Sequence, residues 1–258
     1  MKPFSPCRRC GKKSDPSDRS PIGFYRDPDI PGNVIECPHH AEWRDRTNKI
    51  RKYTRRGFRE DGWDLVYPGG YVGDRSRHNM ETVLEYVESF KTSGSLRKHT
   101  LYFCGPQGCQ KTLIASYVGA ELTRAGFDCR FVVMNDLVKK LLEIKFDDGA
   151  TEYVDDLQRA DLIIYDESFD LDKLTLYKSG YQIPFLDTFL RSNLRKHGNI
   201  FISNVYPNEI DDKFGPSIRD LMQREVEYFD TLLTFTDNWR NGNGIPKDTL
   251  FTRRRHDG

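Results

Sequence analysis

The sequence predicts an α/β fold in which helices flank a mostly parallel sheet of five strands. From residue 79 onward, short apolar runs alternate with helical segments, the pattern of a parallel sheet with helices on both faces. The apolar runs are continuous, as expected for strands buried on both sides. A glycine-rich segment follows the first run directly and precedes a helix, which places a turn for a ligand at the end of that strand.

Apolar periodicity and end signals define the individual elements. Helices are predicted over residues 79–90, 111–126, 136–146, 185–198 and roughly 216–228. Asn135 is expected to cap the third of these helices, and Gly198 to end the fourth. Strands are predicted over residues 100–104, 129–134, 161–167, 199–204 and 231–235.

Composition divides the chain into three parts. Residues 1–41 are rich in Cys, Pro, Gly and Ser, residues 42–78 combine a basic helix (42–60) with a glycine-containing linker, and residues 79–258 form the main domain. Residues 1–60 contain 15 Lys and Arg against 8 Asp and Glu, although the whole chain has a net charge of +1. This asymmetry predicts an anionic partner for the N-terminal part.

No stretch of the sequence approaches 18 consecutive apolar residues, and the N-terminus lacks an apolar signal-peptide core. We therefore expect no membrane association and a cytoplasmic location. In such a reducing compartment, the six cysteines favour metal ligation over disulfide bonds.

The segment after the first strand has the form of a Walker A loop, which cradles phosphates with backbone N–H groups at a helix N-terminus. It consists of Gly105, Pro106, Gln107, Gly108, Cys109, Gln110, Lys111 and Thr112. Lys111 is expected to reach the β- and γ-phosphates of ATP, and Thr112 to hold Mg²⁺. Gln110 stands where the motif usually has glycine, which leaves the rate of turnover in question.

Two further strand ends complete the predicted ATP site. The third strand ends in Asp166 and Glu167, a Walker B pattern. Asp166 is expected to hold Mg²⁺ through water, and Glu167 to act as the base for the attacking water. Asn204 ends the fourth strand, where its side chain is expected beside the γ-phosphate to position that water.

The N-terminal part carries two pairs of metal-ligand residues. Cys7 and Cys10 form one pair, and Cys37 and His40 form the second. Two such pairs predict a tetrahedral structural Zn²⁺ site, with His39 as the alternative fourth ligand. A segment of this length with few apolar side chains needs such a metal to fold.

Over roughly residues 79–240, the chain resembles the AAA+ core of DnaC/IstB-type proteins, the helicase loaders and transposition helpers. The resemblance rests on GPQGCQKT, LIIYDE, NIFISN and the segment 214–240, in that order. It implies an AAA+ type sheet without a helical lid, and ATP bound between subunits of a homo-oligomer. It also implies an arginine finger that acts on the neighbouring subunit's site, with Arg224 the best positional match and Arg219 the second.

The resemblance favours an ATPase of the helicase-loader type, with a replicative helicase and single-stranded DNA as partners. The basic helix contacts either nucleic acid or a protein partner, and the sequence does not separate the two. An IstB-like transposition helper is one alternative. A zinc-containing adaptor that binds ATP without hydrolysing it is another, and Gln110 is the residue that keeps it open.

Overall fold

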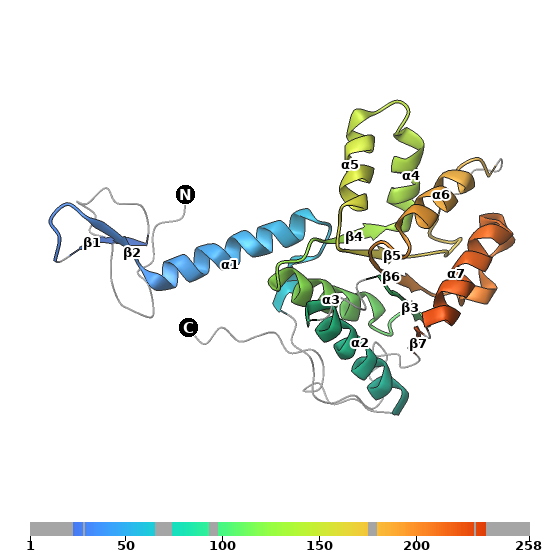
Figure 1. Cartoon of the computed structure of the whole chain (residues 1–258), viewed down its shortest axis with the longest axis horizontal. Helices are drawn as coiled ribbons and strands as arrows, with labels where there is room; N and C mark the ends of the chain where they lie inside the picture. The colour runs from blue at the N-terminus through green and yellow to red at the C-terminus, as the bar shows by residue number, and fades with distance from the viewer. Residues whose placement is uncertain are drawn as a thin grey trace. The chain divides into compact units, whose positions relative to one another are not determined.

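The computed structural model describes residues 23–27, 29–64, 74–92, 98–174, 180–229 and 231–235. The chain divides into two compact units, with the boundary between Lys52 and Tyr53. The first unit holds a β-hairpin and most of the first helix, and the second holds the main sheet (Figure 1).

The first unit contains a two-stranded antiparallel hairpin, β1 (Phe24–Arg26) and β2 (Val34–Glu36), which the sequence pattern did not predict. Helix α1 (Pro38–Arg55) follows it. The predicted bounds of this helix, 42–60, are wrong at both ends. Proline suits the first turn of a helix, and Gly57 ends the helical path with a φ of 92°.

The second unit is built on a parallel sheet with the strand order β4-β5-β6-β3-β7, which confirms the predicted fold class. The strands are β3 (Thr100–Cys104), β4 (Cys129–Val133), β5 (Leu162–Asp166), β6 (Gly198–Ser203) and β7 (Leu232–Thr234). The chain crosses from β3 to the far edge at β4 and later returns to the other side of β3 at β7. Ligands in such sheets bind beyond the carboxyl ends of the strands.

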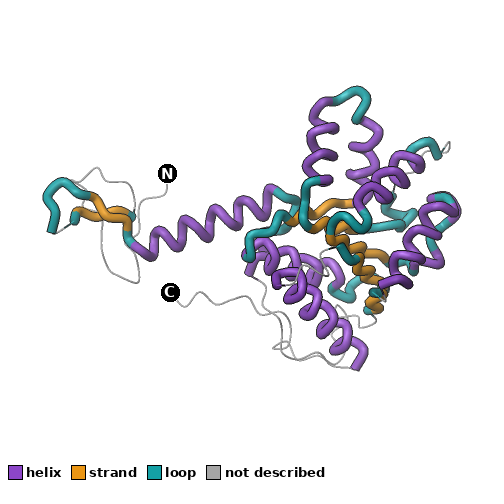
Figure 2. Tube along the Cα trace, viewed as in Figure 1, coloured by secondary structure: helices purple, strands orange, loops and turns teal. Residues whose placement is uncertain are grey.

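Helices cover both faces of this sheet. They are α2 (Asp74–Thr92), α3 (Lys111–Arg124), α4 (Met134–Glu143), α5 (Asp148–Gln158), α6 (Ile183–Asn193) and α7 (Pro216–Phe229), with short 3-10 turns η2 (Glu60–Asp64), η3 (Pro207–Glu209) and η4 (Asp212–Phe214). Side chains of α4 to α7 share one buried cluster with Tyr102, Tyr165 and Phe201 of the strands. Helices α2 and α3 pack together on the opposite face (Figures 1 and 2).

Local capping explains where the helices depart from the predicted ranges. Asn135 does not cap α4 but lies inside it, since the helix follows Val133 directly. Gly198 does not end α6, because that helix stops at Asn193 and Gly198 opens β6. Helix α5 was not predicted, although Asp147 caps it by accepting a hydrogen bond of 2.9 Å from the backbone N–H of Gly149.

Residues 56–64, here called the anchor segment, join α1 to the main domain and cover the edge of β4. The Phe131 N–H donates to the Arg56 carbonyl at 2.9 Å. Gly57 lies so close to β4 that a Cβ added to it would be 2.1 Å from the carbonyl oxygen of Phe131. The anchor segment therefore continues the hydrogen bonding of the sheet at its edge strand.

Aromatic packing fixes the anchor segment on helix α3. The rings of Phe58 and Tyr53 stack with centroids 4.3 Å apart, and the Tyr53 hydroxyl donates to the Ser116 carbonyl at 3.0 Å. The Trp63 ring lies under the Arg124 guanidinium at 4.8 Å. No helix in the described ranges is long and apolar enough to cross a membrane.

We predict that Gly119→Ala lowers the free energy of unfolding by about 1–3 kcal/mol, although alanine ordinarily stabilises a helix relative to glycine. A Cβ at this position in α3 would lie 2.2 Å from Cε1 of Phe58. Urea unfolding measures the effect. Phe58→Ala removes the obstructing ring, so the double variant should cost less than the sum of the two single changes. A Gly119→Ala protein as stable as the parent would contradict this packing.

Candidate nucleotide-binding site

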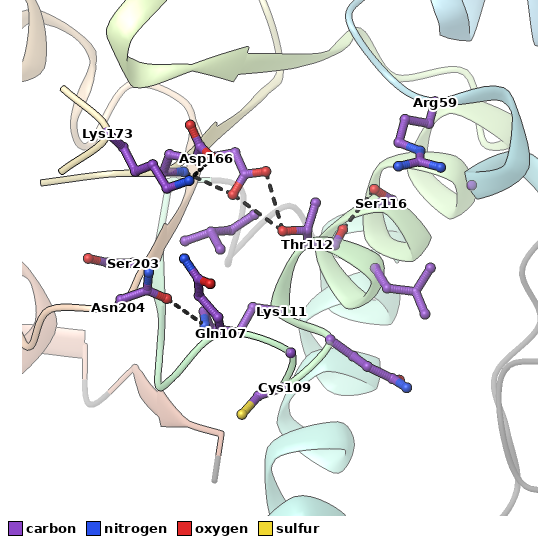
Figure 3. A pocket seen from close by; sticks show the side chains of 16 residues that line it. Arg59, Gln107, Cys109, Lys111, Thr112, Ser116, Asp166, Lys173, Ser203 and Asn204 are labelled. Atoms are coloured by element: carbon purple, nitrogen blue, oxygen red, sulfur yellow. Dashed lines mark hydrogen bonds and ion pairs between the residues drawn. The ribbon is translucent and has the colours of Figure 1, made fainter. Parts of the chain in front are cut away.

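The predicted Walker A loop lies between β3 and α3, at the carboxyl edge of the sheet. It borders a cleft of about 660 Å³ that also receives the ends of β5 and β6 (Figure 3). The residues that line the cleft include Gln107, Lys111, Thr112, Asp166, Glu167 and Asn204. Three loops far apart in the sequence thus place the predicted ATP-site residues around one cavity.

The turn of the Walker A loop contains residues with positive φ, including Gly105 and Gln110. Gly105 has a φ of 145°, and a Cβ there would lie 2.0 Å from the carbonyl oxygen of Phe235. Gln110 has a φ of 62° and a ψ of 13°, a left-handed conformation that favours glycine. Glutamine therefore follows the turn of the motif, with a backbone strain of about 1–2 kcal/mol. Its Oε1 is buried and has no hydrogen-bond partner among the described residues.

The Lys111 ammonium is held at the mouth of the loop. Its Nζ donates to the carbonyl oxygens of Gly105 at 2.6 Å and Pro106 at 2.8 Å, and to Oδ1 of Asn204 at 3.1 Å. The residue is only 6% exposed. Desolvation by burial lowers the pKa of Lys111, while the nearby Cys109, Cys104 and Asp166 act in the opposite direction.

Asp166 faces the start of the loop helix. The Thr112 hydroxyl donates to both carboxylate oxygens of Asp166 at 3.3 Å, and the Glu167 N–H donates to Oδ1 at 2.9 Å. Burial raises the pKa of Asp166, although the hydrogen bonds from Glu167 and Thr112 oppose that shift. A hydroxyl and a carboxylate oxygen are ligands that Mg²⁺ prefers.

Glu167 and Asn204 line the cleft directly after the ends of β5 and β6. Glu167 has a φ of 54°, and its carboxylate forms an ion pair of 3.7 Å with Nζ of Lys173. The side-chain amide of Asn204 donates to Oδ2 of Asp170 at 3.0 Å, while its oxygen accepts from Lys111. The two side chains predicted to handle a water are thus each tied to the loop that follows β5.

These features fit a nucleoside triphosphate with Mg²⁺. The loop offers backbone N–H groups at the N-terminus of α3, a helix of 14 residues. The buried cation of Lys111 has no carboxylate as a direct hydrogen-bond partner in the contacts above, so phosphate oxygens suit it. The unpaired Oε1 of Gln110 is an acceptor that a ligand hydroxyl or amino group, or a water, can satisfy.

The sequence interpretation missed three polar residues around the cleft. Lys173 and Asp170 contact Glu167 and Asn204 from the loop after β5. Arg59 lines the cleft from the anchor segment, although the sequence places it within the predicted basic helix 42–60. No periodic or motif signal marks these positions, since each approaches the cleft only through the fold.

The two candidate finger residues lie on α7, away from this cleft. Arg224 is exposed, and its Nε donates to the Asp220 carbonyl at 3.0 Å. Arg219 forms an ion pair with Asp212. Neither lines the cleft of its own chain, so a role for either arginine requires a neighbouring subunit.

Half of the predicted zinc ligands lie outside the described residues, namely Cys7 and Cys10. In the described part of the chain, no three His, Cys, Asp or Glu residues converge as a metal site. Nδ1 of His40 pairs with Glu36 at 2.9 Å, whereas Nδ1 of His39 lies 3.8 Å from the Cys37 sulfur. The zinc site therefore stays a prediction, with His40 as the expected fourth ligand and His39 as the alternative.

Comparisons with known proteins identify relatives of the second unit. Residues 87–177 match the family described as IstB-like ATP binding protein. Replication initiator DnaA bound to AMPPCP and single-stranded DNA shares 16% identity and a TM-score of 0.53, over 66% of this chain and 49% of that chain. AMPPCP-bound DnaA from Aquifex aeolicus shares 17% identity and a TM-score of 0.51, over 67% of this chain and 50% of that chain. DnaI shares 14% identity and a TM-score of 0.51, over 70% of this chain and 92% of that chain.

The chain spans about half the length of the DnaA structures that it matches. A comparison with curated proteins gives no match. At such identities, similarity to solved structures is a similarity of fold, and the family model adds the ATP-binding assignment. Residues 87–177 thus match the IstB-like ATP binding family, and the second unit shares its fold with DnaA and DnaI.

Proposed function

We propose that this protein is an ATPase of the helicase-loader type. It binds ATP with Mg²⁺ in the cleft at the Walker A loop and hydrolyses it. The nucleotide state then controls contact with a replicative helicase and with single-stranded DNA. The observation that carries the ATPase assignment is the convergence of Lys111, Asp166 and Glu167 on one cavity.

Each cleft residue has a distinct part in this hydrolysis. Lys111 neutralises the β- and γ-phosphates, and Thr112 with Asp166 would hold Mg²⁺. The metal, when bound, supplies positive charge to the phosphate oxygens. Glu167 accepts a proton from the attacking water, and Asn204 orients that water by a hydrogen bond.

Some contacts of Lys111 and Glu167 would be exchanged when ATP binds. The Lys111 ammonium now donates to two loop carbonyls and to Asn204, so phosphate oxygens replace part of this set. Glu167 is paired with Lys173 at 3.7 Å, and both side chains are near 40% exposed. An exposed pair of this kind contributes at most about 1 kcal/mol, so it does not prevent Glu167 from turning to a water.

The loader role has support from the comparisons as well as from the site. DnaI and DnaA share the fold, and the DnaA structure holds AMPPCP and single-stranded DNA.

The IstB-like family model supports the alternative of a transposition helper, which would act on duplex DNA with a transposase. Recovery of a transposase and no helicase with the purified protein would favour that alternative. The strained Gln110 is the observation behind the second alternative, a zinc-containing adaptor that binds ATP without turnover.

We predict that Glu167→Gln lowers ATP turnover by about 10²–10⁴-fold, because it removes the base while keeping the shape of the side chain. Phosphate release, measured with and without single-stranded DNA, checks this prediction. ATP affinity should stay close to that of the parent protein. Lys111→Ala serves as the binding-deficient control, and Lys139→Ala, on the exposed surface of α4, as the neutral control.

The same experiment separates the alternatives. Turnover that single-stranded DNA stimulates and that the Glu167→Gln change removes supports the loader assignment. Tight ATP binding without turnover in the parent protein points to the adaptor. Unchanged ATP binding after Lys111→Ala would contradict the phosphate site itself.

We propose further that the active form is a homo-oligomer in which Arg224 completes the neighbouring subunit's site. Arg224→Ala should then lower stimulated turnover by about 10³-fold or more and leave ATP binding unchanged. Mixing it with the Lys111→Ala variant should restore activity, because that variant still supplies Arg224 to its neighbour. If Arg219→Ala behaves in this way and Arg224→Ala does not, the finger is Arg219. The absence of rescue in both mixtures would argue against an arginine acting between subunits.

A structural zinc site in residues 1–41 completes the proposal, with Cys7, Cys10 and Cys37 as ligands and a histidine as the fourth. Purified protein prepared without chelators should contain about one zinc per chain. Elemental analysis measures this content. His40→Ala should lose the metal more readily than His39→Ala, since His40 is the expected fourth ligand. Metal-free protein that is folded would contradict the site.

A further inference from the structure

Arg59 approaches the nucleotide cleft from a part of the chain that holds none of the Walker motifs. It lies in the anchor segment, between the buried Phe58 and the turn η2, and its own side chain is exposed. The arginine lines the cleft together with Thr112 and Ser116, which lie in the first two turns of helix α3 (Figure 3). It also lines an adjoining cavity of about 670 Å³, which shares Thr112 and Asp166 with the cleft. Arg59 thus stands at the boundary between the two cavities.

The backbone that carries Arg59 is held firmly against α3. Phe58 and Trp63, on either side of it, are 4% and 5% exposed. The Gly62 N–H donates to the Arg59 carbonyl at 3.0 Å, and a Cβ on Gly62 would lie 2.6 Å from the Tyr53 hydroxyl oxygen. The Cα of Arg59 therefore has a fixed position, and its long side chain is the part that can reorient toward a ligand.

The cations of the cleft come from two directions. Lys111 and Lys173 reach it from the Walker A loop and from the loop after β5. In Figure 3, Arg59 lies on the other side of Thr112 from Lys173. Thr112 and Asp166 would hold Mg²⁺, and Arg59 lines the same cleft as these two residues.

We propose that Arg59 binds the terminal phosphate of ATP within its own subunit. This inference rests on the proposed function, since it requires ATP in the cleft. A guanidinium presents two parallel N–H groups to phosphate oxygens, a geometry that a lysine cannot reproduce. Arg59 then distinguishes ATP from ADP in the bound state and opposes the charge that develops during hydrolysis. Its role differs from that of Arg224, which would serve a neighbouring subunit.

Equilibrium binding of AMPPCP and of ADP, each with Mg²⁺, tests this assignment without requiring turnover. Arg59→Ala should weaken AMPPCP binding by about tenfold or more, the effect of losing a charge-assisted hydrogen bond. ADP binding should change by less than about twofold, within the effect of an ordinary surface substitution. Arg59→Lys should recover only part of the loss, because it restores charge without the planar fork. Arg55→Ala is the matched control, since Arg55 is also exposed and lines the adjoining cavity but not the nucleotide cleft.

The outcomes separate the inference from the proposed function. A parent protein that binds neither nucleotide would overturn both. If the parent binds AMPPCP and Arg59→Ala binds it equally well, only the role of Arg59 is wrong. An equal loss of AMPPCP and ADP in Arg59→Ala, or the same loss in Arg55→Ala, also overturns the inference, because it indicates a structural or a general electrostatic effect. The thermal midpoint of each variant should match that of the parent.

Discussion

The hydrogen-bonded register of three adjacent parallel strands is the constraint on which the site depends. Cys104 of β3 pairs with Ser203 of β6. Tyr165 of β5 pairs with Phe201, which also lies in β6. Because the strands run in one direction, their carboxyl ends meet at a single edge of the sheet. The loops that carry Lys111, Asp166 and Asn204 therefore open into one cleft. A slip of β5 by one residue would turn the Asp166 side chain to the opposite face of the sheet.

Strain in the backbone is concentrated at this edge. Among the described residues other than glycine, those with positive φ are Gln110, Glu167, Phe169 and Arg195. The first two line the cleft. Residues in such conformations persist where the surrounding packing determines the backbone, and they gather at functional sites. Here β5, buried from Leu162 to Tyr165, and the fully buried β6 hold the turn after Asp166 in place. The side chain predicted to act as a base is therefore presented by a backbone that an unsupported loop would not adopt.

The anchor segment links the chain upstream of the main domain to the nucleotide site. Tyr53, Phe58 and Trp63 fill the space along α3, the helix that begins with Lys111 and Thr112. Because Gly119 has no side chain, the Phe58 ring can pack against α3. Because Gly57 has none, the anchor segment can approach the Phe131 carbonyl at the edge strand β4. The same packing that stabilises α3 thus brings Arg59 to the cleft. The stability of α3 and the position of Arg59 at the cleft thus have one structural origin.

The sequence alone determined the five strands, the order of helices and strands, and the two phosphate motifs, because continuous apolar runs and glycine-rich turns are local signals. It did not determine where helices end: α6 stops at Asn193, and α5 depends on a cap at Asp147. Only the tertiary structure placed Arg59, Asp170 and Lys173 around the cleft. Such contacts join residues through strand order and packing, and no pattern of neighbouring residues encodes them.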